Sequence, residues 1–378
     1  MRSLPLDDVL PRVAEIVRDV RERGDEALLD WTERLDGERP PLGVAGEQLE
    51  SARLAPEALE AVRALADAVR TFSEAQRPRD TAVEAVPGVV SERRWVPLRS
   101  VGIYVPGGRA AYPSSLVMAA VPARVAGVER LAVATPRPAE ATLAVARELG
   151  IDEVYAVGGA QAVAALAYGT ETIGPVDKIV GPGNRWVTAA KLLVSGSVAI
   201  DLPAGPSEVV VIADGTAVAA QCAADLLAQA EHGPDSEAIL LALDDDLAAA
   251  VSNLVAGAEN VRVERSATLD EALRRSEQYA PEHLELWLAD SAAAAARVRN
   301  AGTVFLRTPA VVGDYAAGAT HVLPTGGLAR GAGGLGLESF LKPVQFVAAT
   351  TLERAREIAL PLARAEGLPA HAAALEVV

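Results

Sequence analysis

The sequence predicts an α/β fold with parallel sheets, and three observations lead to this prediction. The chain has 378 residues, which is too long for one ordinary hydrophobic core and favours about two domains. Half of the residues are hydrophobic and 23% are charged, which is the composition of a compact globular protein. From about residue 130 onward, short apolar segments alternate with segments of helical period, a pattern typical of parallel strands joined by crossover helices.

The first hundred residues are predicted to form two helices and then β structure. Apolar side chains recur at helical spacing over residues 9–20, and Gly24 stands where that helix should end. A second apolar stripe covers residues 56–72 and begins with a proline, which suits the first turn of a helix. Residues 83–105 are rich in Val, Trp and Ile and contain Pro87-Gly88 as a turn, so they are predicted to be β structure.

Two blocks of strands separated by helices are predicted to follow. The strands of the first block are expected at residues 131–134, 153–156, 178–180 and 198–200, and those of the second at residues 209–212, 239–242, 261–263, 284–288 and 303–306. The blocks meet near Ala204-Gly205-Pro206. A glycine-rich stretch at residues 326–336 comes next, and the tail after it is predicted to be helical as far as Val378.

Charge and cysteine content exclude several classes of function. The formal net charge of -16 repels phosphate backbones and anionic lipids, so neither nucleic acid nor a membrane surface is expected as a partner. Apolar runs fall short of the roughly 18 residues that span a bilayer, and residues 1–10 carry acids where a signal peptide would be basic, so we expect a cytoplasmic location. A single cysteine, Cys222, excludes an internal disulfide, a cysteine-rich zinc module and an iron–sulfur cluster.

Three junctions between a predicted strand and a helix carry glycines and polar side chains, at residues 104–108, 157–161 and 181–184. In an open parallel sheet, ligands bind at the carboxyl ends of strands, where helix N-termini offer N–H groups to anions. Gln161 and Asn184 have amide groups that can hydrogen-bond a ribose or a carboxamide. Each junction alone is explained equally well as a tight turn that needs glycine, but the three together favour a nucleotide-like ligand.

Two other features are interpreted as structural. The spacing G-x-G-x-x-G occurs at residues 331–336, but it follows Pro324-Thr325 instead of a strand, so it lacks the context that gives this motif its mechanism. Cys222 lies in an alanine-rich helical segment without an adjacent base, so it is predicted to be a core residue and not a nucleophile.

The histidines and their neighbours are candidate metal ligands or catalytic groups. Four histidines occur in the chain: His232, His283, His321 and His371. Gln229 and His232 are three residues apart at the end of a predicted helix, so both can reach one ion. Asp314 and His321 lie in a loop-like segment, and Glu282-His283 follows Pro281 at the start of a strand. These side chains suit a borderline cation such as zinc, although residue types alone leave a metal site and structural roles equally open.

Seven strings, in this order, resemble the histidinol dehydrogenase family: VGIYVPGG, KIVGPGN, IDLPAGPSEV, QAEH, YAPEHLEL, GDYAAGATHVLPTGG and AEGLPAH. The resemblance extends from about Val20 to His371. It implies a zinc-dependent, NAD-linked enzyme that oxidises L-histidinol via L-histidinaldehyde to L-histidine, a four-electron reaction that ends histidine biosynthesis. The chain departs from the family pattern at Ala319-Thr320, at residues 342–344 and in the short segment after His371.

The resemblance also assigns residues. It implies one zinc ion per subunit, with ligands at Gln229, His232, Asp314 and His371. It places the catalytic pair at Glu282 and His283, the substrate contacts at Ser207, His283, His321, Glu366 and the metal ligands, and the NAD contacts at Tyr104, Gln161 and Asn184. His283 is then the base that takes the hydroxyl proton, and Glu282 activates the water that adds to the aldehyde. The zinc would position the substrate's imidazole and amine.

The implied fold has two incomplete, doubly wound Rossmann-like domains, the second inserted in the first, and a helical C-terminal tail. The expected boundaries are 1–103 with 209–335 for the first domain, 104–208 for the NAD-binding domain, and 336–378 for a dimerisation tail. In this family the tail reaches into the partner subunit, so Glu366 and His371 would complete the site of the other chain in a homodimer.

Three alternative functions are weighed against this one. A related NAD dehydrogenase for another small alcohol would keep Glu282-His283 and the NAD junctions but change the substrate contacts, whereas Ser207 and Glu366 are present. A zinc hydrolase would not need the three nucleotide-like junctions. A non-catalytic metal-binding protein would not need Glu282-His283.

Overall fold

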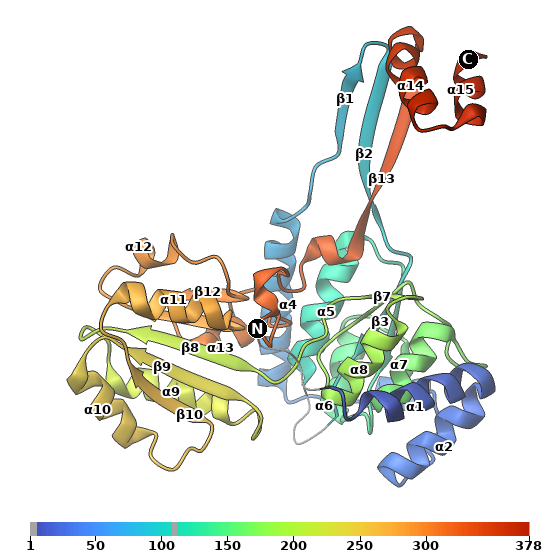
Figure 1. Cartoon of the computed structure of the whole chain (residues 1–378). Coiled ribbons are helices and arrows are strands. Elements are labelled where there is room, and N and C mark those ends of the chain that lie inside the picture. Colours follow the sequence, from blue (N-terminus) through green and yellow to red (C-terminus); the bar gives the residue numbers. More distant parts are fainter. Residues whose placement is uncertain (1–5, 108–111, 378) are drawn as a thin grey trace.

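The computed structural model describes residues 6–107 and 112–377, which form two α/β units and a projecting arm (Figure 1). Each unit contains a five-stranded parallel sheet, so the predicted fold class is confirmed. The first sheet has the order β5-β4-β3-β6-β7, and the second has the order β10-β9-β8-β11-β12. The strands of the first sheet are β3 (Ser100–Tyr104), β4 (Arg130–Ala134), β5 (Glu153–Tyr155), β6 (Lys178–Val180) and β7 (Ala199–Ile200). Those of the second are β8 (Glu208–Ala213), β9 (Glu237–Ala242), β10 (Val261–Arg265), β11 (His283–Trp287) and β12 (Thr303–Leu306).

Helices cover both faces of each sheet, which is why the central strands are runs of buried residues without alternation. All six residues of β8 are buried. The helices of the first unit are α5 (Pro113–Ala126), α6 (Glu140–Glu148), α7 (Gly159–Tyr168) and α8 (Arg185–Val194). Those of the second are α9 (Ala219–Ala230), α10 (Asp245–Leu254), α11 (Leu269–Tyr279), α12 (Ser291–Ala295) and α13 (Ala310–Tyr315). None of the helices described is long and apolar enough to cross a membrane.

The N-terminal helices belong to the first unit. They are α1 (Leu10–Arg23), α2 (Asp25–Asp36), α3 (Gly46–Ser51) and α4 (Pro56–Ala75). Helix α1 packs on α7 and α8, and α4 packs on α5. This differs from the expected division, which joined the N-terminal helices to residues 209–335. The expected boundary at residue 103 would also cut β3, whose residues pair with β4 and β6. Helix packing and strand pairing are long-range contacts, so the local sequence pattern did not reveal them.

The arm is an antiparallel sheet of the order β1-β2-β13, followed by two helices at its end (Figure 1). Its elements are β1 (Thr81–Val86), β2 (Val89–Pro97), β13 (Leu341–Ala349), α14 (Glu353–Ala365) and α15 (Pro369–Glu376), and two 3₁₀ turns, η1 (Leu328–Arg330) and η2 (Leu337–Phe340), precede β13. The helical prediction for the tail is confirmed for α14 and α15 but is wrong for β13. That segment is a strand because it pairs residue by residue with β2. It is an edge strand, which is where a proline such as Pro343 is tolerated.

Candidate active site

The three predicted NAD junctions lie at the carboxyl edge of the first sheet, after β3, β5 and β6. Strands β3 and β6 are neighbours although β4 and β5 intervene in the chain, so the edge between them is the switch point at which open α/β sheets bind ligands. Gly181 has a φ of +112°, and a Cβ there would lie 2.1 Å from the carbonyl oxygen of Tyr104. Only glycine therefore allows the two loops to meet. Gly108, the last residue of the first junction, lies outside the described residues.

The predicted NAD-contacting side chains differ in how they are used. The Tyr104 hydroxyl accepts a hydrogen bond from the N–H of Gly159 at 3.1 Å, and burial raises the pKa of Tyr104 to about 12, so it stays neutral. Gln161 is 1% exposed, and its Oε1 finds no hydrogen-bond partner within the part of the chain that is described. Asn184 caps α8, because its Oδ1 accepts from the N–H groups of the second and third helical residues at 3.0 and 3.2 Å. Only its amide nitrogen remains for a ligand.

A buried ion pair between Lys191 and Asp201 supports the Gly181 turn, and sequence analysis did not identify it. Both side chains are 2% exposed. The Nζ of Lys191 donates to the carbonyl of Gly181 at 3.0 Å, and Oδ2 of Asp201 accepts from the N–H of Gly181 at 2.7 Å. The pair therefore fixes both backbone polar groups of the glycine at the switch point. The available signal was Lys191 itself, because a lysine on the buried side of a predicted helix needs a partner of opposite charge.

Glu282 and His283 lie at the amino end of β11 in the second sheet, whereas the predicted NAD junctions lie at the carboxyl edge of the first sheet. Oε2 of Glu282 accepts from the N–H of Glu208 at 2.9 Å, and the Ser207 hydroxyl also hydrogen-bonds this carboxyl group. Glu282 is 5% exposed, and burial raises its pKa well above the ordinary value. Burial lowers the pKa of His283 to about 4, so its ring is neutral. Its Nδ1 has no hydrogen-bond partner among the residues described.

His321 joins the two units at this site. Its Nδ1 lies 3.2 Å from the carbonyl oxygen of Asp314, which can only accept a proton, so Nδ1 carries the hydrogen. Its Nε2 therefore accepts from the Ser115 hydroxyl at 3.1 Å, and burial keeps the pKa of His321 below the ordinary value. Ser115 lies in the first turn of α5, directly beyond the carboxyl edge of the first sheet. Sequence analysis missed Ser115, because no local pattern indicates that it faces His321.

The predicted metal ligands of one chain fit a cation, but they form an incomplete set. Nδ1 of His232 is 3.3 Å from the carbonyl of Gln229, which leaves Nε2 as the lone-pair donor, as is usual for metal-binding histidines. The Gln229 amide is buried, and its Nε2 is unpartnered in the described part of the chain. Asp314 and His232 are close enough for their charges to affect the pKa of His283. Within residues 6–107 and 112–377, no group of three or more His, Cys, Asp or Glu side chains could hold a metal.

Glu366 and His371 do not reach this site within their own chain. Both are exposed, at the end of α14 and in α15, and the arm holds these helices far from α9 and α13 (Figure 1). Large apolar side chains are also exposed on the arm, including Val347 at 70% and Leu362 at 58%. A patch of this kind on a projecting element is typical of a surface that another chain covers.

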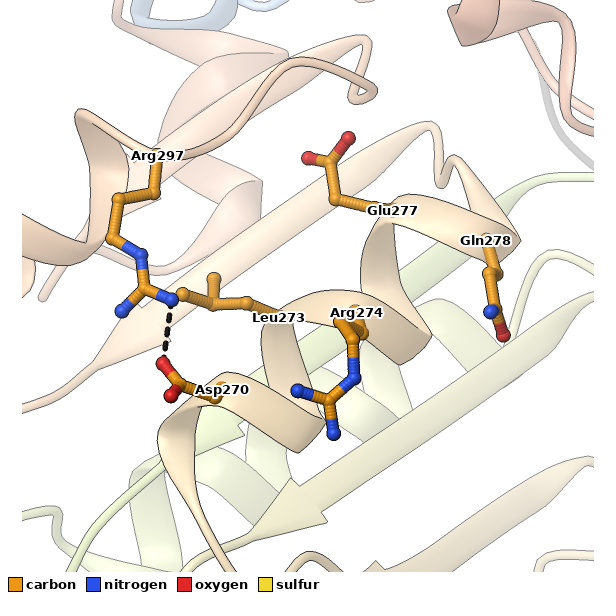
Figure 2. A pocket seen from close by; sticks show the side chains of 6 residues that line it. All are labelled: Asp270, Leu273, Arg274, Glu277, Gln278 and Arg297. Carbon is orange, nitrogen blue, oxygen red and sulfur yellow. Dashed lines mark hydrogen bonds and ion pairs between the residues drawn. The ribbon is translucent and has the colours of Figure 1, made fainter.

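A separate polar groove lies on the outer face of α11 and holds none of the predicted site residues. It is lined by Asp270, Leu273, Arg274, Glu277, Gln278 and Arg297 (Figure 2). Arg297 donates to Asp270 at 2.6 Å across it, so this pair of charges is neutralised locally. Nothing in the groove points to a ligand.

Comparisons with known proteins show the family to which the chain belongs. The family model for histidinol dehydrogenase matches residues 2–378. The chain is 43% identical to the histidinol dehydrogenase of Methanosarcina barkeri, with 99% of this chain and 93% of that protein covered. It is 46% identical to that of Methanothermobacter thermautotrophicus, with 98% and 93% covered. The crystal structure of histidinol dehydrogenase from Elizabethkingia anophelis superposes with a TM-score of 0.93 at 34% identity, covering 99% of this chain and 93% of that one. The chain therefore belongs to the histidinol dehydrogenase family.

Proposed function

We propose that this dehydrogenase is a zinc-dependent, NAD-linked enzyme that oxidises L-histidinol through L-histidinaldehyde to L-histidine, the last steps of histidine biosynthesis. It acts in the cytoplasm as a homodimer, and each active site draws residues from both chains. The observation that carries the proposal is the buried pair Glu282 and His283, held beside His321 and Asp314 at the contact between the two units. Membership of the family supports the choice of substrate.

In the first oxidation, a base must take the hydroxyl proton as a hydride leaves the carbon. His283 suits this task because burial keeps its ring neutral, so a lone pair is available. Its unpartnered Nδ1 is consistent with a polar contact that only a ligand completes. His321, fixed by Ser115 and by the carbonyl of Asp314, lines the same space and keeps one tautomer.

In the second oxidation, water must add to the aldehyde before another hydride can leave. Glu282 is the base that activates this water. Because burial raises the pKa of Glu282, its carboxylate is a stronger base than an exposed one. The N–H of Glu208 and the hydroxyl of Ser207 orient the carboxyl group. A covalent route through a thiol is disfavoured, since Cys222 is fully buried and its pKa is raised to about 12 by burial.

Two bound groups complete the site in this proposal. When bound, Zn²⁺ would hold the imidazole and amine of the substrate, and NAD would accept the hydrides at the carboxyl edge of the first sheet. Gln229, His232 and Asp314 would hold the metal together with the partner subunit's His371, and the partner subunit's Glu366 would contact the substrate. Tyr104, Gln161 and Asn184 would contact the dinucleotide. The exposed apolar side chains of the arm support the dimer, because a second chain would bury them.

One assay tests the proposal and its alternative. The purified protein is loaded with Zn²⁺ and given NAD with histidinol, and NADH absorbance is followed with an amine reagent present to trap aldehyde. Two NADH per histidinol and no trapped aldehyde are expected, and a chelator should abolish the signal. A single NADH per histidinol with trapped aldehyde would contradict the role of Glu282. No reduction with histidinol, but turnover of another small alcohol, would favour the alternative of a related dehydrogenase with a different substrate.

A further inference from the structure

Two carboxyl groups, those of Asp225 and Glu285, lie in contact beneath the active site. Glu285 is completely buried and Asp225 is 8% exposed. Asp225 lies on α9, one turn before Gln229, and Glu285 lies on β11, two residues after His283. Because side chains alternate along a strand, Glu285 and His283 share one face of β11. Among the described residues, neither carboxyl group is paired with a lysine or arginine, so the interior holds two acids without a counter-charge.

Each oxygen of Glu285 already accepts a hydrogen bond from a nitrogen. Oε1 accepts from the backbone N–H of Ala310 at 2.8 Å, and Oε2 accepts from Nε1 of Trp287 at 2.8 Å. The Asp225 side chain is also hydrogen-bonded to Glu285. Oδ2 of Asp225 has no other partner within the described chain. Two carboxylates can share a hydrogen bond only if one of them carries a proton.

Electrostatics places a single proton on the pair. Burial raises the pKa of both carboxyl groups, and the nearest further titratable group, Cys222, is a neutral thiol. Two adjacent carboxylates in a dry interior cannot both be ionised at neutral pH without a cation. Since both oxygens of Glu285 face N–H donors, the proton belongs on Asp225 and points toward Glu285.

The pair connects the three elements that carry the predicted ligands. Asp225 is on α9, which carries Gln229 and ends just before His232, Glu285 is on the strand of His283, and Ala310 begins α13, the helix of Asp314. Helix α13 has only six residues, so its own hydrogen bonds hold it weakly in place. The hydrogen bond from Ala310 to Glu285 anchors its first turn.

We propose that Asp225 and Glu285 share one proton and act as a brace that positions α9 and α13 for metal binding. They are positioning residues and do not touch the substrate. This inference rests on the proposed zinc site. The brace sets the distance between Gln229 on α9 and Asp314 on α13, because Glu285 of β11 is bonded to both helices. Sequence position gives no sign of it, because a glutamate within a strand and an aspartate within a helix look like ordinary surface residues.

Two substitutions that each replace one carboxyl group with an amide of the same shape test the proposal. In Asp225→Asn, the new NH₂ group donates to Glu285 as the proton did, so the brace survives. In Glu285→Gln, the new NH₂ group must face the N–H of Ala310 or of Trp287, so one bond is lost. Zinc affinity is measured by competition with a chromophoric chelator, and ligand geometry by the visible absorption of the Co²⁺-loaded dimer. We expect Asp225→Asn to match the wild type and Glu285→Gln to bind zinc about 10- to 100-fold more weakly, with an altered cobalt spectrum.

A comparison of Asp225→Ala with Asp225→Asn keeps the proposal testable if Glu285→Gln does not fold. Asp225→Ala removes the donor that Asp225→Asn keeps, so it should weaken zinc binding where the amide does not. The matched control is Asp270→Asn with Glu277→Gln on the exposed groove of α11, which should leave zinc affinity unchanged. If wild-type protein does not bind zinc, the proposed function fails. If it binds zinc and the three variants at positions 225 and 285 bind as well as the wild type, or if Asn and Ala at 225 behave alike, the brace is overturned.

Discussion

Complementation between two inactive variants should restore activity if, as proposed, each site needs the two α/β units of one chain, here called the body, and the arm of the other. In a dimer of a His371→Ala chain with a His232→Ala chain, one site combines the intact body of the first with the intact arm of the second. The other site carries both lesions. Each heterodimer therefore has one working site of two, and about half of the wild-type rate per dimer is expected. The position of α15 at the far end of the arm supports this expectation, since His371 is exposed there and distant from α9 and α13, so it can be a ligand only for another chain.

The assay uses co-expression of the two variants with different affinity tags, tandem purification of the heterodimer, and NADH formation with histidinol. A matched control pairs His232→Ala with Asp314→Ala. Both of these ligands belong to the body, so each site of that heterodimer lacks one ligand and no activity should return. The reasoning is refuted if the purified heterodimer of the His371 and His232 variants is no more active than its parents, or if the control pair recovers equally.

Three further predictions concern the interior. Glu282→Gln should slow the oxidation of supplied aldehyde more than the first hydride transfer, by about 10²–10⁴ in single turnover, since only the second step needs water activation; equal losses would contradict this division. Cys222→Ala should leave turnover nearly unchanged, and a loss above a hundredfold, about 2.7 kcal/mol of barrier, in a folded variant would restore the thiol route. Burial raises the pKa of both carboxyl groups of the Asp225–Glu285 pair, that of Glu285 from 4.5 to about 8, so the folded pair binds its shared proton more tightly than the unfolded chain does. The stabilisation by this proton is complete below pH 4.5 and is lost as the pH rises to about 8. The Tm of the metal-free wild type should therefore fall more between these pH values than the Tm of Asp225→Asn. Parallel Tm curves would count against a shared proton.

The parts of the site that could be predicted from local sequence are those built within one element. Gln229 is in the last turn of α9 and His232 lies just beyond its end, so their closeness in sequence suffices to keep them together, with Nδ1 of His232 3.3 Å from the Gln229 carbonyl. Glycines after β3, β5 and β6 indicated the ligand-binding edge, because the carboxyl ends of parallel strands meet at one edge of a sheet. The roles of Glu282 and His283 followed from the family resemblance, since a Glu-His pair at the start of a strand has no mechanism of its own.

The parallel sheets were determined by the sequence itself, because strands buried on both faces must be continuous apolar runs, and such runs were visible from Leu131 to Leu306. Only the tertiary structure decided which elements meet. It placed β13 beside β2, Ser115 against His321, and Asp225 against Glu285. It also placed Glu282 and His283 at the amino edge of the second sheet, whereas the predicted NAD junctions lie at the carboxyl edge of the first. These contacts join residues 60 to more than 200 positions apart, and a local pattern records the propensity of each segment but not the partner that its packing will bring.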